Sequence, residues 1–147
     1  ITTPGDVLDF AILKEGLLAD RNAYVLSRVG YDPWQATQLA QEMLAEGIPM
    51  VEVRATVNNF SAPMKELDAL VRAGLIHHDG NPVMRWMISN VIAHTDAKEN
   101  IYPRKERAEN KIDGVVAAII ALYLAMVGVL DVDSSCVFSA ERGLLSL

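Results

Sequence analysis

The sequence has little cysteine, no excess of positive charge and no apolar run long enough to cross a membrane. Its single cysteine, Cys136, excludes an internal disulfide framework and is compatible with a reducing cytosol. A net charge of −6 is unlike that of a general nucleic-acid binder, so a polyanion would have to bind a local basic patch. The longest apolar run, Val115 to Leu130, is shorter than the roughly 20 residues of a membrane-spanning helix. We therefore expect a buried helix there and no membrane partner.

What is present fits a folded domain. The chain has 147 residues, of which 51% are hydrophobic, enough for a real core in one domain or part of one. It opens with ITTPGD, without an initiator Met or a signal-type apolar stretch, which we interpret as a piece cut from a longer protein.

Segments with helical spacing of apolar residues alternate with short β-branched segments, which predicts an α/β fold with a largely sandwiched sheet. Strands are expected in AYVLSRVGYD, PMVEVRAT and VIAHTD, a short extended piece and a turn in LIHHDGNP, and a polar hairpin or loop in AKENIYPRKERAENK. Helices are expected from about Asp6 to Asp20, from Pro33 to Gly47, from Ser61 to Gly74, briefly after Pro82, and from Lys111 to about Val127. Asp32 and Ser61 are the expected N-caps of the second and third helices.

Asp113 stands at the start of the last, otherwise apolar helix and has two interpretations. With Asn110 as N-cap it would be the third helical residue, the acidic position of a capping box. It also shares a face with Ala117, Ile120 and Leu124, the stripe expected to pack on the sheet, and a buried acid needs a partner. A neighbouring stripe of small residues predicts close approach to another element: Gly114, Ala118, Ala121 and Ala125.

Asp32 is similarly ambiguous. It precedes Pro33, which suits a cap, and it also follows a strand at the edge where open α/β sheets place their ligands. Two carboxylates meeting at such an edge could hold hard cations such as Mg²⁺ or Mn²⁺. Sequence spacing does not decide whether Asp32 and Asp113 meet.

Three segments of the sequence carry a family resemblance: YDPWQATQLAQEMLAEG, SAPMKELDALVRAGLIHHDGNPVMRWMISNV and IYPRKERAENKIDGVVAAIIAL. In their order and spacing they resemble the large terminase subunit of tailed bacteriophages. The ending CVFSAERGLLSL is similar to that family's S-x-Y-E-x-R-G-L, with departures at Val137, Phe138 and Ala140. The combination of YDPW, HxGNPVxRW and KIDGVVA is specific, although each motif alone is weak.

The resemblance implies an RNase H-like fold, a mixed sheet flanked by helices, that lacks its first strands in this chain. Residues 1–130 would be the C-terminal portion of the nuclease domain and residues 131–147 a C-terminal tail. The implied function is that of a metal-dependent endonuclease that cuts concatemeric phage or prophage DNA in the cytoplasm of the bacterial host. No Walker A loop is found, so the family's ATPase domain is not expected here.

The same resemblance assigns site residues. Asp32 matches the family's acid on the strand of the YD motif, and Asp113 matches its acid on the final helix. Both are implied to be catalytic and to bind Mg²⁺ or Mn²⁺, together with a first acid expected upstream of Ile1. His78 matches the histidine before GNP and would face DNA, although a surface or turn histidine explains it equally well.

Positive charge is concentrated before the last helix, in Lys98, Arg104, Lys105, Arg107 and Lys111. A solvated loop would explain this cluster. Beside the two acids, Arg104, Lys105 and Lys111 would instead hold the phosphate backbone of double-stranded DNA.

Two hypotheses remain at the level of sequence. A nuclease requires the Asp32 and Asp113 oxygens to approach within roughly 4–5 Å, so that one ion can bridge them. The alternative is an interaction module whose acids are only caps and whose tail docks on a portal or procapsid. In the full-length protein the implied partners also include the small terminase subunit. A sheet without its first strands predicts pairing with a second copy of the chain.

Overall fold

The computed structural model describes residues 9–128, 145 and 146, and the chain divides into two compact units, Ile1–Glu52 and Val53–Leu147. The α/β class predicted from the sequence is confirmed. Within the described residues the strands form three separate two-stranded sheets, β1–β2, β3–β6 and β4–β5. Two-stranded sheets are not stable on their own, so this arrangement fits a partial domain supported by its helices.

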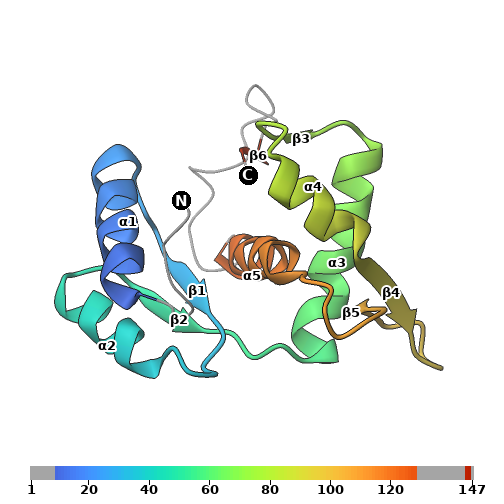
Figure 1. The fold of residues 1–147 in the computed structure, drawn as a ribbon. Helices are drawn as coiled ribbons and strands as arrows, with labels where there is room; N and C mark the ends of the chain where they lie inside the picture. Colours follow the sequence, from blue (N-terminus) through green and yellow to red (C-terminus); the bar gives the residue numbers. More distant parts are fainter. Residues whose placement is uncertain (1–8, 129–144, 147) are drawn as a thin grey trace. The chain divides into compact units, whose positions relative to one another are not determined.

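The first unit contains α1 (Phe10–Ala23), β1 (Val29–Tyr31), α2 (Thr37–Ala45) and β2 (Met50–Glu52), with α1 and α2 side by side (Figure 1). The two strands are parallel, and Val29 lies opposite Met50. Lys14 on α1 joins the helices through Glu42 and Glu46, with nitrogen–oxygen distances of 3.9 and 3.3 Å. The N-cap of α1 is Asp9, whose Oδ1 accepts the Ala11 N–H at 2.9 Å, so the helix begins later than the predicted Asp6.

The turn between β1 and α2 corrects the predicted role of Asp32. Asp32 Oδ1 accepts the Trp34 N–H at 2.9 Å, which closes an Asx turn before the helix. Helix α2 begins only at Thr37, and its N-cap, Ala36, makes no side-chain capping bond. Asp32 is therefore not a helix cap, because its oxygen is used by the turn. The predicted stop at Gly47 is confirmed, since α2 ends at Ala45 and Gly47 has a φ of 80°.

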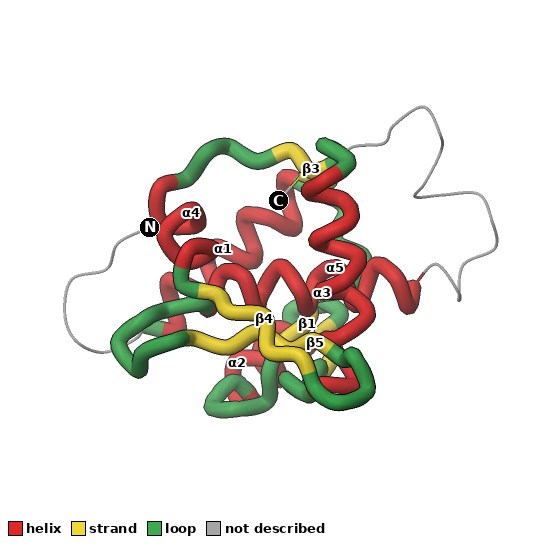
Figure 2. Tube along the Cα trace, turned by 90° about the vertical axis from the view of Figure 1, so that its right-hand side faces the viewer, coloured by secondary structure: helices red, strands yellow, loops and turns green. Residues whose placement is uncertain are grey.

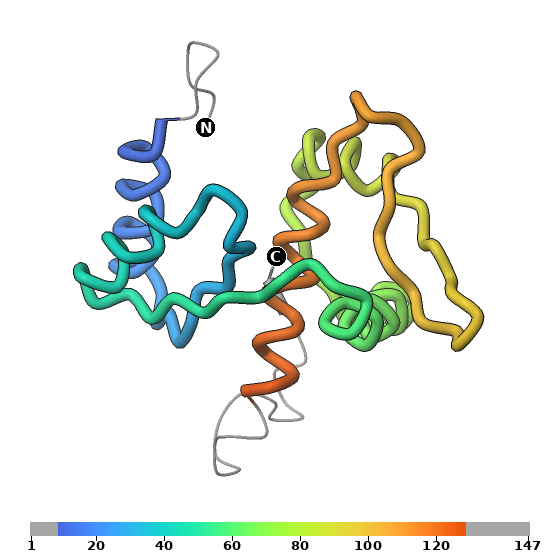
Figure 3. Tube along the Cα trace, turned by 90° about the horizontal axis from the view of Figure 1, so that it is seen from below, coloured from blue at the N-terminus to red at the C-terminus, as the bar shows by residue number. Residues whose placement is uncertain are grey.

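The second unit contains α3 (Val57–Arg72), β3 (Ile76–His77), α4 (Pro82–Ser89), β4 (Val91–Thr95), β5 (Ile101–Lys105), α5 (Asp113–Gly128) and β6 (Leu145–Ser146). Strands β4 and β5 form an antiparallel hairpin, with Val91 opposite Lys105 and Thr95 opposite Ile101 (Figure 2). Strand β4 lies in the predicted strand VIAHTD, whereas the sequence placed the hairpin or loop later, in residues 97–111. After β5, a loop leads to the start of α5 (Figure 3). Strands β3 and β6 are parallel.

The tight hairpin turn is organised by Asp96. Its Oδ1 accepts the backbone N–H groups of Lys98 and Asn100 at 2.8 and 2.9 Å, and its Oδ2 accepts the Asn100 side-chain amide at 2.9 Å. These hydrogen bonds, first of all the one from the Asn100 side chain, lower the pKa of Asp96.

The core of the second unit is centred on Phe60, which is fully buried and stacks on Tyr102 with ring centroids 5.8 Å apart. Helix α3 begins at Val57, one turn before the predicted Ser61, because Thr56 Oγ1 caps it by accepting the Asn59 N–H. Ser61 is instead buried, and its Oγ accepts the Ile101 N–H at 3.1 Å. This bond joins α3 to β5.

Close packing of α4 against α5 depends on Gly114. A Cβ atom at this position would lie 2.9 Å from Met87 Sδ and 3.0 Å from Met84 Sδ, too near for either sulfur to remain in place. The close approach predicted from the small-residue stripe is thus observed at its first residue.

The division into residues 1–130 and a tail of 131–147 stays a prediction, because nearly all of the tail lies outside the described residues.

None of the helices described is both long and apolar enough to span a membrane.

Candidate functional site

An open depression of about 390 Å³ lies between the end of β5 and the start of α5. It brings together the following residues: Pro103, Arg104, Lys105, Asn110, Lys111, Ile112 and Asp113. Four of the six site residues predicted from the sequence therefore lie around one concave surface. Its charge pattern, one carboxylate among three cations, suits a ligand that carries phosphate groups.

Asp113 is the first residue of α5 and is exposed. The first helical bond runs from the Val116 N–H to the Ile112 carbonyl, so Asp113 is not the third residue of a capping box that begins at Asn110. Its predicted face is mixed, because Ala117 is exposed whereas Ile120, farther along, is buried. Among the residues described, nothing donates a hydrogen bond to the Asp113 carboxylate or pairs with it.

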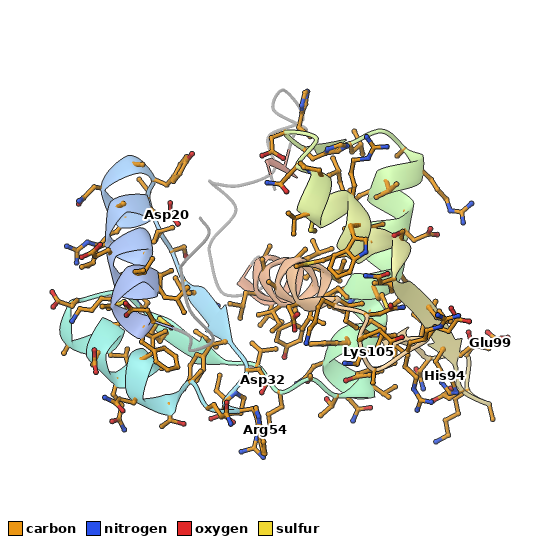
Figure 4. All side chains as sticks on the ribbon, viewed as in Figure 1. Asp20, Asp32, Arg54, His94, Glu99 and Lys105 are labelled. Atoms are coloured by element: carbon orange, nitrogen blue, oxygen red, sulfur yellow. The ribbon has the colours of Figure 1, made fainter. Side chains whose placement is uncertain are left out.

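Hydrogen bonds and strand pairing position the three cationic residues of the depression, Arg104, Lys105 and Lys111. Lys105 Nζ donates to the Ala108 carbonyl at 2.9 Å, which orders the loop after β5 (Figure 4 labels Lys105). The Lys111 carbonyl accepts the Asn90 side-chain amide at 3.0 Å, which joins the start of α5 to the end of α4. Arg104 lies opposite Ile92 in the hairpin. All three cationic side chains are exposed, and Lys98 and Arg107 do not line the depression.

His78 lies in the turn between β3 and α4 and does not line the depression. Its Nδ1 accepts the Gly80 N–H at 3.0 Å, so this nitrogen carries no proton in the turn. The same turn continues through Asn81, whose Oδ1 caps α4 by accepting the N–H groups of Val83 and Met84. His78 therefore has a turn role, and its contact with DNA stays a prediction.

Asp32 lies in the first unit, directly after β1, as the sequence predicts. Asp113 belongs to the second unit, so each acid is positioned by its own unit. No group of three or more His, Cys, Asp or Glu side chains that could hold a metal ion occurs in residues 9–128. A metal site built from Asp32 and Asp113 would need further ligands from water, substrate or another part of the protein.

Sequence reasoning did not assign three residues of the depression to the site, Pro103, Asn110 and Ile112, because none of them carries charge. The available signal was strand alternation, which places Pro103 on the buried side of β5 next to Arg104.

Comparison with known proteins decides the family. The sequence model of the family "Terminase large subunit, endonuclease domain" matches residues 13–128. The chain belongs to this family. The matched terminase nuclease segment contains Asp32, Asp113 and every residue of the depression.

Two curated relatives match most of this chain. Over 126 residues, 84% of this chain, it is 40% identical to Protein YmfN of Escherichia coli K12 and 25% identical to the large terminase subunit of Enterobacteria phage HK97. The matches cover 28% and 25% of those proteins, so this terminase chain spans about a quarter of their length.

Solved structures confirm the fold predicted from the resemblance. The HK97 bacteriophage large terminase matches with a TM-score of 0.73 and 25% identity, over 84% of this chain and 26% of that one. The large terminase nuclease from thermophilic phage G20c matches with a TM-score of 0.60 over 84% of this chain and 64% of that one. At 17% identity the second match speaks for the fold alone. The chain has the RNase H-like fold of terminase nucleases, in part.

Proposed function

We propose that this chain supplies part of the active site of a metal-dependent endonuclease that cuts concatemeric viral DNA during packaging. The observation that carries the proposal is the exposed Asp113 carboxylate at the rim of a depression lined by Arg104, Lys105 and Lys111. Membership of the terminase endonuclease family supports it, because the match covers the whole depression.

The residues fit a hard divalent cation. Carboxylate oxygens are the ligands that Mg²⁺ and Mn²⁺ prefer, and Mg²⁺ is commonly held by one or two carboxylates, with water and substrate phosphates completing its shell. Asp113, with no protein partner in the described part of the chain, and Asp32 at a strand end would hold it. When bound, the ion would supply charge stabilisation and activate water for phosphodiester hydrolysis.

The cations of the depression would bind the DNA backbone. Arg104, Lys105 and Lys111 lie within one surface on a chain of net charge −6, so the basic character is local. Backbone contacts of this kind orient a duplex without reading its bases, and we expect little sequence selectivity from them. The acid beside them would meet the phosphate through the cation that it holds.

The remaining partners belong to the same proposal. Double-stranded DNA would contact this chain directly, and the small terminase subunit and the portal or procapsid would be engaged through the full-length protein in the host cytoplasm. The alternative, a docking module that acts through residues 131–147, depends on residues that lie almost wholly outside those described. Pairing with a second copy through an exposed sheet edge also stays a prediction.

Replacing Lys105 by alanine tests the DNA surface. We expect the slope of log K against log salt for a labelled duplex to fall in magnitude by about 0.9, because one phosphate contact is lost. Fluorescence anisotropy between 50 and 200 mM salt measures it. Lys98→Ala is the matched control, since this exposed lysine lies in the same hairpin but outside the depression. Equal slopes for both variants would contradict the proposed surface.

A further inference from the structure

Trp34 is an aromatic side chain that the fold leaves in solvent. It is 80% exposed, whereas the other tryptophan, Trp86, is 48% exposed. An indole at the surface offers a flat apolar ring and an N–H group to a partner. Among the described residues of the first unit, the buried apolar side chains are Ala40, Met43 and Ile48, so Trp34 is outside this core.

The backbone fixes Trp34 beside Asp32. The Trp34 N–H donates to Asp32 Oδ1 at 2.9 Å, and Pro33 between them restricts the chain further. The next residue, Gln35, has a φ of 58°, in the left-handed region that costs energy for any residue other than glycine. The turn therefore holds the Trp34 backbone next to the Asp32 carboxylate, and the exposed indole projects from this turn.

From this placement we infer that Trp34 is a stacking platform for a nucleobase of the DNA strand that is held at Asp32. The inference rests on the proposed nuclease function. Every base has a flat π-face, so stacking on an indole tolerates any sequence. Bases inside a duplex already stack on their neighbours. The indole therefore takes an unpaired base at a frayed end or in an opened strand.

Single-strand binding tests this inference. The chain is titrated, in Ca²⁺ as a divalent cation for the carboxylates, with an eight-nucleotide single strand and with a blunt duplex of the same sequence. Trp34→Ala is expected to weaken single-strand binding about 5- to 150-fold, the range measured for one stacked base, and to change duplex binding little. Trp34→Phe keeps an aromatic face and should retain most of the affinity. Trp86→Ala is the matched control and should bind as the wild type does.

A spectroscopic readout separates stacking from an indirect effect. The chain has two tryptophans, so Trp86→Phe leaves Trp34 as the sole indole. Its emission should be quenched by the single strand and then become shielded from iodide. Because Trp34 is exposed, Trp34→Ala should keep the wild-type far-UV circular dichroism. If Trp34→Ala unfolds, the emission of Trp34 in the folded Trp86→Phe variant decides whether the single strand stacks on it.

The outcomes distinguish this inference from the proposed function. Unchanged single-strand affinity in Trp34→Ala, or emission that the single strand leaves unaltered, overturns the stacking role while salt-dependent duplex binding still stands. If wild type binds neither oligonucleotide, the DNA surface and the stacking role both fail.

Discussion

Cleavage of plasmid DNA in Mn²⁺ falls roughly 100- to 1,000-fold when Asp113 is replaced by asparagine, the scale on which loss of one preorganised charge-stabilising group lowers a rate. Asparagine keeps the shape of the side chain but removes the charge that holds a divalent cation. The fold should persist, because Asp113 is exposed and its favourable effect on the α5 dipole is about 0.3–1 kcal/mol.

This experiment is best performed in a longer protein, since the chain spans about a quarter of its relatives. A chimera in which this chain replaces the matched 126 residues of the large terminase subunit of Enterobacteria phage HK97 supplies that context. Glu109→Gln is the matched control, because this exposed acid lies four positions before Asp113 and does not line the depression. Wild-type cleavage by Asp113→Asn would leave a docking scaffold as the better account.

Replacing Phe60 by alanine should lower the free energy of unfolding of the second unit by about 3–5 kcal/mol. Phe60 is fully buried and stacks on Tyr102, so its removal loses transfer free energy and leaves a cavity. Urea denaturation, followed through Trp86 emission in a Trp34→Phe background, measures the change in this unit.

The control for this loss is Val71→Ala in α3, the helix that carries Phe60, where the side chain is 60% exposed. Surface substitutions of this kind change stability by about 0.5 kcal/mol or less. If Phe60→Ala lowers the free energy of unfolding by less than about 1 kcal/mol, the contact between α3 and β5 is not part of the core of this unit.

The sequence predicted those elements whose signals are local. Strand β4 was predicted from VIAHTD and α5 from its long apolar segment, whereas β5 lies in residues 97–111, which were predicted only as a polar hairpin or loop. The end of α2 follows from Gly47, the residue that best tolerates a φ of 80°. The strand before Asp32 was found for the same reason, since its β-branched and aromatic residues are contiguous.

Helix starts were predicted less well, because several residues near each start can serve as caps and tertiary contacts select among them. Asp32 is used by the Asx turn, so α2 starts later than predicted. Ser61 is used by β5, so Thr56 caps α3. Such choices depend on contacts between distant segments, which periodicity does not encode.

The candidate site likewise has one part that is local in the sequence and one part that is distant. Arg104, Lys105, Lys111 and Asp113 are close in the sequence, and the structure brings them to one depression. Asp32 is far from them in the chain and belongs to the other unit. Its proposed pairing with Asp113 rests on the family motifs and not on any local pattern.

The central claim, that Asp32 and Asp113 hold the same metal ion, is tested most directly by Mn²⁺ binding. Isothermal titration of the chimera compares wild type, Asp32→Asn, Asp113→Asn and the double variant. We expect each single variant to lose at least about 10-fold in affinity. The double variant should lose little more, because two ligands of one ion are not independent. Wild-type Mn²⁺ affinity in either single variant, or losses that simply add in the double variant, would contradict the claim.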